Sequence, residues 1–254
     1  MNIECSRLPN GLTIITDRID TVETVSTGVW VNVGTRDENP DLNGISHLLE
    51  HMAFKGTKRR DAYSIAAEIE DVGGQINAYT SREHTAYFAK ILKDDVPIAL
   101  DILGDILQHS KLDEDEIKRE QAVILQEINQ ANDTPDDIIF DYFQEAAFPD
   151  QAMGRPVLGR PNVLLEINRE HIRSHMDTHY CGDQMIVAAA GNLDHQVFSR
   201  IVESTFDSLE KTSAHQRAPG IYSGGDIRTI RELEQAHVVF GTNGISYKDD
   251  AFYS

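Results

Sequence analysis

The pattern of apolar and polar positions predicts that the chain begins with strands. Residues 12–15 are strand-like, and residues 22–33 alternate valines with smaller or polar residues, which is the two-residue period of a half-buried strand. We expect these segments to be neighbouring antiparallel strands. A hairpin is expected further along, because residues 75–80 and 85–92 are strand-like and only a polar turn separates them.

Helical periodicity fills most of the remaining chain. Residues 43–55 and 63–72 have helical apolar spacing, and the glycine pair that follows would end the second helix. A buried strand is expected at 185–190. Proline or acidic residues in the first turn predict helices at 95–110, 113–129 and 136–147. Apolar periodicity predicts two further helices at 169–180 and 195–209.

This order of elements predicts an α+β fold with a mostly antiparallel sheet flanked by helices. The first unit would occupy residues 1–210. Residues 211–225 are rich in Ser, Gly and polar residues, which is typical of a linker. Residues 226–254 would start a second unit, with a strand at 236–242, so we expect a truncated chain.

Composition excludes several classes of protein. No stretch approaches the about 18 consecutive apolar residues of a membrane span, and the first twenty residues lack a signal-peptide pattern. The two cysteines, Cys5 and Cys181, form no CxxC pair, which argues against a disulfide framework and a cysteine zinc site. The net charge of -19 disfavours nucleic acid and anionic lipid, and it either attracts a basic partner or serves solubility alone.

The segment His-Leu-Leu-Glu-His at 47–51 carries the clearest chemical signal. His47 and His51 are four residues apart, so they share one helix face and can reach a single metal ion. Two imidazole nitrogens suit zinc, and Glu50 is placed to take a proton from water activated by the metal. The order HxxEH is the inverted zincin signature.

A catalytic zinc site usually has three protein ligands, so another ligand is expected elsewhere in the chain. Glu127 is the candidate, and Glu120 lies two turns earlier on the same helix face. Apolar neighbours mark a buried flank that would carry both carboxylates partly inward. From spacing alone, solvated helix carboxylates are the simpler interpretation.

His171, His175 and His179 form a competing candidate, because they also recur every four residues. That spacing alone permits chelation. No acidic residue is positioned between them as a base, and the neighbouring Arg173 and Asp177 indicate a solvated or packed helix face.

Segments along nearly the whole chain resemble one family. They are LPNGLTIITD, GVWVNVGTRDE, NGISHLLEHMAFKGT, GGQINAYTSREHTAYFAKIL, REQAVILQEI, GRPVLGRP and IVAAAGN. Through them the chain resembles the pitrilysin-type (M16) zinc metallopeptidases, and in particular the mitochondrial processing peptidase beta subunit and its bacterial relatives. The resemblance implies the N-terminal half of a two-repeat M16 fold of the LuxS/MPP type.

The resemblance also implies the roles of site residues. His47, His51 and Glu127 would hold one Zn²⁺ per catalytic domain, with Glu50 as general base and Glu120 as an assisting carboxylate beside the site.

Substrate-binding residues follow from the same resemblance. Asn77 and Ala78 lie in the strand where relatives bind a peptide as an added β-strand. Asp137 and Asp141 match positions where relatives read a basic residue near the cut, and they share a helix face. On sequence alone these two aspartates are solvated surface charges.

The implied activity is that of a zinc-dependent endopeptidase acting on extended peptides; presequence-like peptides, general oligopeptides and one dedicated precursor all stay open as substrates. Relatives have a second half that closes over the substrate, so this piece is expected to bind zinc and to cleave poorly. The full-length protein would be a homodimer or would pair with an inactive M16 relative. The alternatives are a non-catalytic M16-like binding or assembly subunit and a zinc-stabilised interaction domain. A bacterial cytoplasmic setting is expected, with the mitochondrial matrix as the other option.

Overall fold

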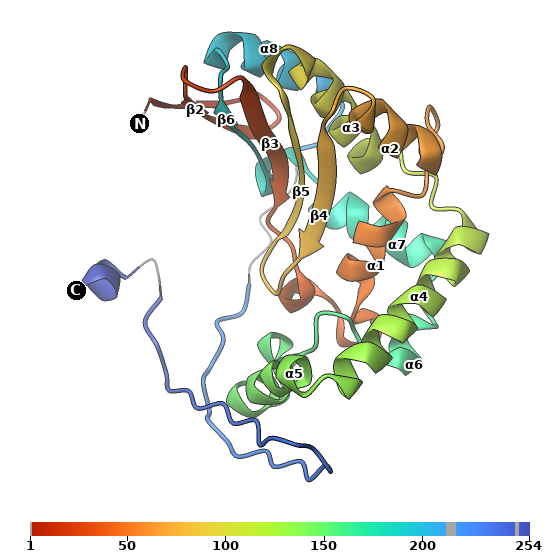
Figure 1. Cartoon of the computed structure of the whole chain (residues 1–254), viewed down its shortest axis with the longest axis vertical. Coiled ribbons are helices and arrows are strands. Elements are labelled where there is room, and N and C mark those ends of the chain that lie inside the picture. Colours follow the sequence, from red (N-terminus) through yellow and green to blue (C-terminus); the bar gives the residue numbers. More distant parts are fainter. Residues whose placement is uncertain (1, 212–216, 247–248) are drawn as a thin grey trace.

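The computed structural model describes residues 2–211, 217–246 and 249–254. In this part of the chain a six-stranded sheet has the order β1-β2-β6-β3-β5-β4 (Figure 1). Its strands are β1 (Ile3–Arg7), β2 (Thr13–Arg18), β3 (Thr24–Val31), β4 (Gln75–Thr80), β5 (Thr85–Leu92) and β6 (Met185–Gly191). Only the β2–β6 pair is parallel. The predicted α+β fold with a mostly antiparallel sheet is therefore confirmed.

The expected pairing of the first two predicted strands is wrong, because β6 lies between β2 and β3. Ile15 of β2 is opposite Ala188 of β6, and Val29 of β3 is opposite Val187. The insertion buries alternate residues of β6, including Met185 and Val187, in the core. β1, which was not predicted, pairs with the outer side of β2. Adjacency in sequence is only a tendency for strand pairing, and burial of this late strand overrides it.

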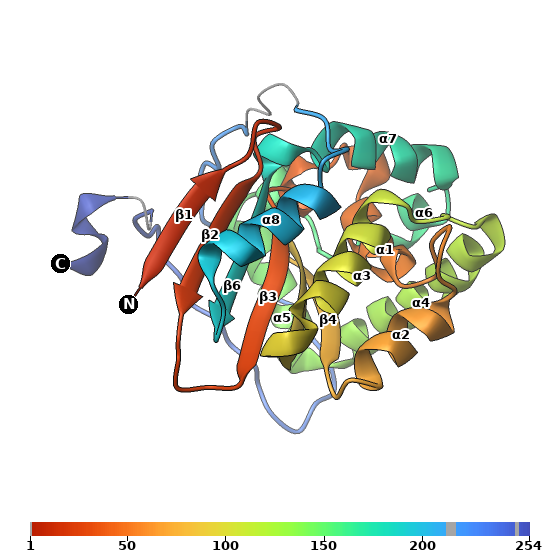
Figure 2. The ribbon, with the colours of Figure 1, turned by 90° about the horizontal axis from the view of Figure 1, so that it is seen from above.

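Eight α-helices accompany the sheet in the described ranges. They are α1 (Ile45–Ala53), α2 (Ala62–Glu70), α3 (Val96–Gln108), α4 (Glu114–Asp133), α5 (Pro135–Ala147), α6 (Pro161–Leu164), α7 (Arg169–His179) and α8 (His195–Thr205). The seven predicted helices are confirmed to within a few residues at each end, and the short α6 was not predicted. Figure 2 shows α3 and α8 lying across the sheet, where they contact β3, β5 and β2.

Helix α1 lies beyond the β4 edge of the sheet and contacts both β4 and α4 (Figure 1). Leu48, Leu49 and Met52 of α1 are fully buried, as are Ile117 and Ile124 of α4. The apolar stripes of the two helices therefore face the same core. This packing turns the polar flank of α4 toward the HxxEH segment.

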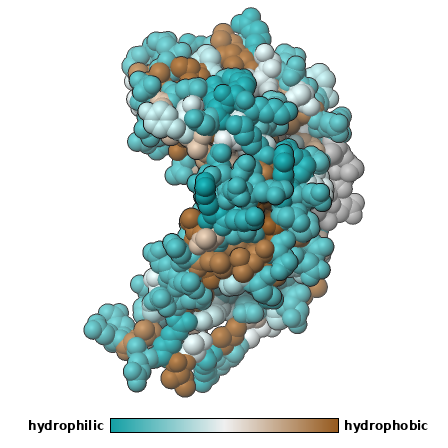
Figure 3. Space-filling view, turned by 90° about the vertical axis from the view of Figure 1, so that its right-hand side faces the viewer, coloured by the Kyte–Doolittle hydropathy of each residue, from teal (hydrophilic) through white to brown (hydrophobic). Residues whose placement is uncertain are grey.

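Figure 3 shows the side of the molecule that carries α4 and α7, where hydrophilic side chains surround a hydrophobic patch.

A buried carboxylate holds the start of α1. Glu38 accepts hydrogen bonds from the backbone N–H groups of Gly44 (2.8 Å) and Ser46 (2.9 Å), and from the side chain of Asn43 (2.9 Å). Helix starts leave such N–H groups without intrahelical partners and favour negative charge. Burial raises the pKa of Glu38, and these hydrogen bonds partly offset the effect. Gly44 has a φ of 102°, a conformation that favours glycine.

The strand expected at 236–242 is wrong in this structure. Residues 217–246 have no strand and run beside α5 (Figure 1), where residues 225–240 and α5 enclose a cavity of about 690 Å³. A strand needs a partner for its backbone N–H and C=O groups, and none of the described strands pairs with this segment. In the same segment, Ile230 and Phe240 are 99% and 93% exposed.

The proposed division of the chain stays a prediction. Of the expected linker at 211–225, residues 212–216 lie outside the described residues, and the rest has no regular structure. Residues 247–248 of the expected second unit also lie outside them. Within the described ranges, no helix has the length and apolar character needed to cross a membrane.

Candidate metal centre

His47, His51 and Glu127 converge between α1 and α4. One candidate ligand atom from each residue lies within 4.8 Å of the others. Glu127 Oε2 is 3.8 Å from the Nε2 atoms of both histidines. All three side chains are half-buried, so the group remains accessible from outside. No other set of three His, Cys, Asp or Glu side chains comes together in this way among the described residues.

The donor set and its spacing fit zinc. Two imidazole nitrogens and one carboxylate, with a fourth position left open, are a common ligand set of catalytic zinc. Ligand atoms about 2.0 to 2.2 Å from a tetrahedral ion lie about 3.3 to 3.6 Å apart, close to the observed 3.8 Å. Burial, followed by the charge of His51, lowers the pKa of His47 to about 4. The ring of His47 is therefore neutral at pH 7, as a metal ligand must be.

Glu50 is held against the edge of the sheet. Its Oε2 accepts a hydrogen bond of 2.6 Å from the hydroxyl of Thr80, the last residue of β4. Burial raises the pKa of Glu50, and the Thr80 hydrogen bond partly offsets that rise. A raised carboxylate pKa suits a general base, whose efficiency is highest when its pKa approaches the working pH. Thr80 was missed by sequence reasoning, since an isolated strand threonine gives no signal.

Glu120 joins the site from the interior of α4. Its Oε2 is 2.9 Å from Nδ1 of His51, and its Oε1 is 2.7 Å from Nζ of Lys55. Burial works to raise the pKa of Glu120, but the hydrogen bonds from Lys55 and His51 outweigh it, so the pKa lies below its usual value. Because the Glu120 carboxylate accepts this hydrogen bond, the donor is the N–H group at Nδ1 of His51. The other ring nitrogen, Nε2, is then left to face Glu127. Lys55 was not singled out from the sequence.

Asn77 and Ala78 lie on β4, a strand at the edge of the sheet that pairs with β5 alone among the described strands. Its other edge is the kind of surface to which an extended peptide can be added. Asn77 is exposed, and its side-chain oxygen accepts a hydrogen bond of 2.8 Å from the backbone N–H of Ala78.

The two aspartates of α5 are placed differently from each other. Asp141 accepts a hydrogen bond of 2.8 Å from Arg82, in the turn between β4 and β5, and Asp137 is exposed. Asp141 is thus joined to the hairpin turn rather than to the histidine pair. Its carboxylate has an arginine partner within the chain itself.

The histidine row of α7 does not converge on a common point. His175 is buried, and its Nε2 is 3.4 Å from the hydroxyl of Ser46. Nδ1 of His171 instead accepts a hydrogen bond of 3.3 Å from the backbone of Asn168 at the start of the helix. The competing metal site therefore finds no support in the described part of the chain.

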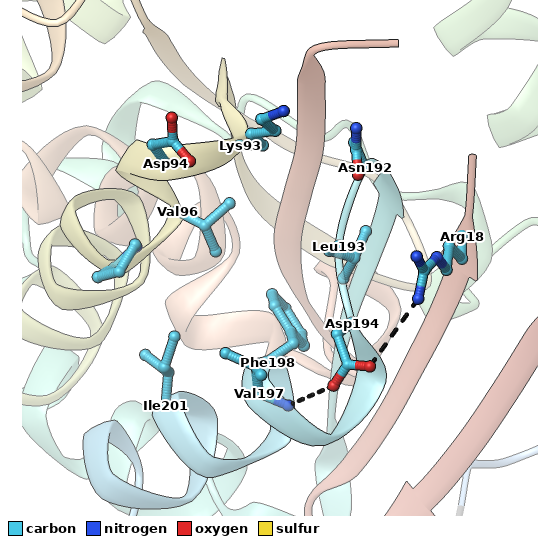
Figure 4. Close-up of a pocket in the computed structure, with 11 residues that line it drawn as sticks. Arg18, Lys93, Asp94, Val96, Asn192, Leu193, Asp194, Val197, Phe198 and Ile201 are labelled. Atoms are coloured by element: carbon cyan, nitrogen blue, oxygen red, sulfur yellow. Dashed lines mark hydrogen bonds and ion pairs between the residues drawn. The ribbon is translucent and has the colours of Figure 1, made fainter. Parts of the chain in front are cut away.

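A cavity of about 420 Å³ lies at the opposite end of the sheet (Figure 4). Lys93 and Asn192 line it, and they follow the ends of β5 and β6. Thr80, which contacts Glu50, instead lies opposite Thr85 at the start of β5. The cavity and the candidate metal centre therefore lie at opposite ends of this strand. Asp194 caps α8 at its margin and lies 3.9 Å from Arg18. None of the predicted site residues lines this cavity.

Comparison with known proteins gives consistent matches along the chain. The family model of the insulinase (peptidase family M16) proteins matches residues 13–160, and that of the peptidase M16 inactive domain matches residues 166–253. The second match includes α7 and β6, and β6 is a strand of the central sheet. The two matched regions therefore contribute to one sheet.

Individual relatives match over almost the entire chain. An uncharacterized zinc protease of Rickettsia felis is 41% identical over 246 residues, which are 97% of this chain and 60% of that protein. The mitochondrial-processing peptidase subunit beta of Lentinula edodes is 40% identical and is matched over 98% of this chain and 55% of its own. A solved protease structure from Helicobacter pylori has the same fold, with a TM-score of 0.80, 23% identity, and 87% of this chain and 54% of that one covered. The chain thus spans little more than half the length of these relatives.

Proposed function

This chain belongs to the M16 insulinase family of peptidases, and from that premise we propose that it is the zinc-binding catalytic part of an endopeptidase that cuts extended peptides. The observation that carries the proposal is the convergence of His47, His51 and Glu127 beside Glu50. Spacing alone left Glu127 as one of many helix carboxylates. Its position 3.8 Å from both histidine Nε2 atoms is what supports a ligand role.

Each side chain has a distinct proposed role. His47, His51 and Glu127 hold one zinc ion, which when bound supplies a Lewis acid that activates water and polarises the scissile carbonyl. Glu50 takes a proton from the attacking water and returns it to the leaving amine. Since Thr80 holds Oε2 of Glu50, the other carboxylate oxygen carries that proton. Glu120 orients the ring of His51.

The proposed substrate is a peptide bound in extended form along the outer edge of β4, beside Asn77 and Ala78. Asp137 and Asp141 of α5 would favour a basic residue near the cut, and the net charge of -19 would attract such peptides from a distance. Arg82 already pairs with Asp141, so a substrate arginine would have to displace it. Presequence-like peptides fit these features, and the name of the processing peptidase relatives agrees with them.

The proposed active enzyme contains more than this chain. The chain spans only 55–60% of the two relatives named above. We expect a second half, supplied by the same protein or by an M16 relative in a homodimer or heterodimer, to close over the substrate. The isolated 254 residues should bind zinc and cleave poorly. Because zinc protease relatives are bacterial, we propose a bacterial cytoplasmic protein, with the mitochondrial matrix as the other setting.

The alternative function is a non-catalytic M16-like binding or assembly subunit, and a zinc-stabilised interaction domain is a related possibility. Such a protein needs no general base. The presence of Glu50 beside the complete ligand set, with its pKa raised by burial, favours the peptidase.

Elemental analysis of the purified chain tests the metal site. We expect about one zinc per chain in the natural protein, and loss of zinc in His51→Ala and in Glu127→Ala. Glu114→Ala, which removes an exposed carboxylate from the first turn of the same α4, is the matched control and should keep zinc. Retention of zinc in Glu127→Ala would show that the third ligand is misassigned, and a natural protein without zinc would contradict the proposal.

A further inference from the structure

Lys55 contacts Glu120, and the proposed mechanism assigns no role to this lysine. It follows the end of α1, where its backbone N–H donates to the carbonyl of Met52 (3.1 Å). Its ammonium group reaches α4 and lies 2.7 Å from Oε1 of Glu120. The other oxygen of the same carboxylate is 2.9 Å from Nδ1 of His51. Lys55, Glu120 and His51 therefore form one continuous chain of contacts that ends on a proposed zinc ligand.

The burial of Glu120 makes the contact with Lys55 consequential. The side chain of Glu120 is only 7% exposed, so water contributes little to its solvation. A buried carboxylate needs charged or hydrogen-bonding partners at both oxygens, and loss of one partner is costly. Among the described residues, Lys55 and His51 are the two side chains paired with Glu120, and Lys55 is the one that brings a permanent positive charge.

The two zinc-binding histidines differ in their outer contacts. Nδ1 of His51 is bonded to Glu120, whereas Nδ1 of His47 is buried and has no hydrogen-bond partner in the described structure. Histidine ligands are normally oriented by an acceptor at the second ring nitrogen. The contact from Glu120 is therefore the one such support that this pair possesses in the described structure, and its geometry depends on what fixes Glu120.

We propose that Lys55 is a positioning residue of the metal centre. It fixes one oxygen of Glu120, so that the other oxygen holds the His51 ring with Nε2 directed at Glu127. The inference rests on the proposed function, because it takes His51 as a ligand of a zinc-type divalent cation. Lys55 touches neither the metal nor the substrate in this scheme, and it acts only through Glu120.

Zinc affinity of the purified chain, measured by competition with a chromogenic chelator, tests the role of Lys55. Lys55→Met keeps an apolar stem of similar length and removes the charge. We expect it to bind zinc about 10-fold more weakly, the lower end of the cost of losing an outer partner of a metal ligand, because Lys55 acts one contact further out than Glu120. Lys55→Arg should restore most of the affinity, because it returns a donor of the same charge.

Lys58→Met is the matched control, since it removes an exposed lysine three positions along the chain and should leave the affinity unchanged. Circular dichroism establishes that each variant is folded. Natural protein that binds no zinc would overturn the proposed function together with this inference. Natural affinity in Lys55→Met would overturn this inference alone.

A double-mutant cycle with Glu120→Gln separates positioning from a general effect on folding. If Lys55 acts through Glu120, Lys55→Met should change the zinc affinity by less than about twofold when Glu120 is already replaced. Equal fold-losses for Lys55→Met in the natural and the Glu120→Gln backgrounds would mean that the two residues act independently. That result would overturn the positioning role.

Discussion

Two helices of this protein carry histidines four residues apart, and only one of them forms a candidate metal centre. On α1, His47 and His51 are half-buried, and Glu127 of α4 lies 3.8 Å from both. On α7, His175 and His179 are buried, with 8% and 7% of their surface exposed. The four-residue spacing places histidines on one helix face in both cases. Whether they can bind a metal is decided by what the neighbouring helix places opposite that face.

The two helices also differ in the residue that precedes the second histidine of each pair. On α1 it is Glu50, which is held by Thr80. On α7 it is Ser174 before His175 and Thr178 before His179. A hydroxyl in this position is a poor general base compared with a carboxylate. The α1 pair is therefore suited to catalysis, whereas the α7 row is suited to packing.

Replacing Glu50 of α1 should have the largest effect on peptide cleavage. Glu50→Gln, assayed in the full-length protein, should reduce peptide cleavage about 10²- to 10⁴-fold, because proton transfer by a positioned base contributes that much. Zinc content should stay the same, since Glu50 is not a proposed ligand. Peptide hydrolysis and elemental analysis on the same preparation provide the measurement. Turnover close to that of the natural protein would contradict the role of Glu50.

The next test replaces one histidine on each helix and compares the two effects on zinc binding. His51→Ala should weaken zinc binding by more than about 100-fold, beyond the cost of losing an outer contact, whereas His175→Gln should leave zinc binding unchanged. Chelator competition gives both affinities. A loss of zinc in His175→Gln would mean that the α7 row binds metal, and the contrast between the helices would then fail.

A third test uses the pH dependence of stability. Burial, followed by the charge of His179, lowers the pKa of His175 to about 3, below its ordinary value of 6.5. Between these values the unfolded chain binds a proton at His175 that the folded chain excludes, so stability falls as the pH is lowered from about 6.5 towards about 3. In His175→Gln this contribution is absent, and the unfolding temperature should fall less between pH 7.5 and pH 5.

The measurement is thermal unfolding at both pH values, with a chelator present so that zinc release does not contribute. The other titrating groups remain in both proteins, so the difference between the two proteins isolates His175. An identical pH dependence in the natural protein and in His175→Gln would refute the buried neutral state of this histidine.

The smallest effect is expected from the first histidine of α7. His171 accepts a hydrogen bond from the backbone of Asn168 and thereby completes the cap of the helix start. His171→Ala should cost about 0.5 kcal/mol of folding free energy, the usual order for a cap contact. Urea unfolding measures the change. A loss above about 2 kcal/mol would exceed a cap contribution and indicate a role in the core.

Much of the fold was predictable because its signals are local. Helix periods and end signals gave α1 to α5, α7 and α8, and the two strand-like segments around a polar turn gave the β4–β5 hairpin. The insertion of β6 between β2 and β3 was not predictable in this way, because strand order depends on which faces the helices cover. The strand expected at 236–242 failed for a related reason: strand propensity needs a partner strand, and the segment has none in the described structure.

The same division applies to the site. The sequence by itself determined that His47, Glu50 and His51 share part of one helix surface, because the helical period is set by local backbone geometry. Only the tertiary structure decided that Glu127 faces both histidines, that Thr80 holds Glu50, and that Lys55 reaches Glu120. Those contacts join segments far apart in the chain. The contacts to Glu127 and Glu120 exist because the apolar stripes of α1 and α4 pack into one core, and the contact to Thr80 exists because α1 also packs against β4.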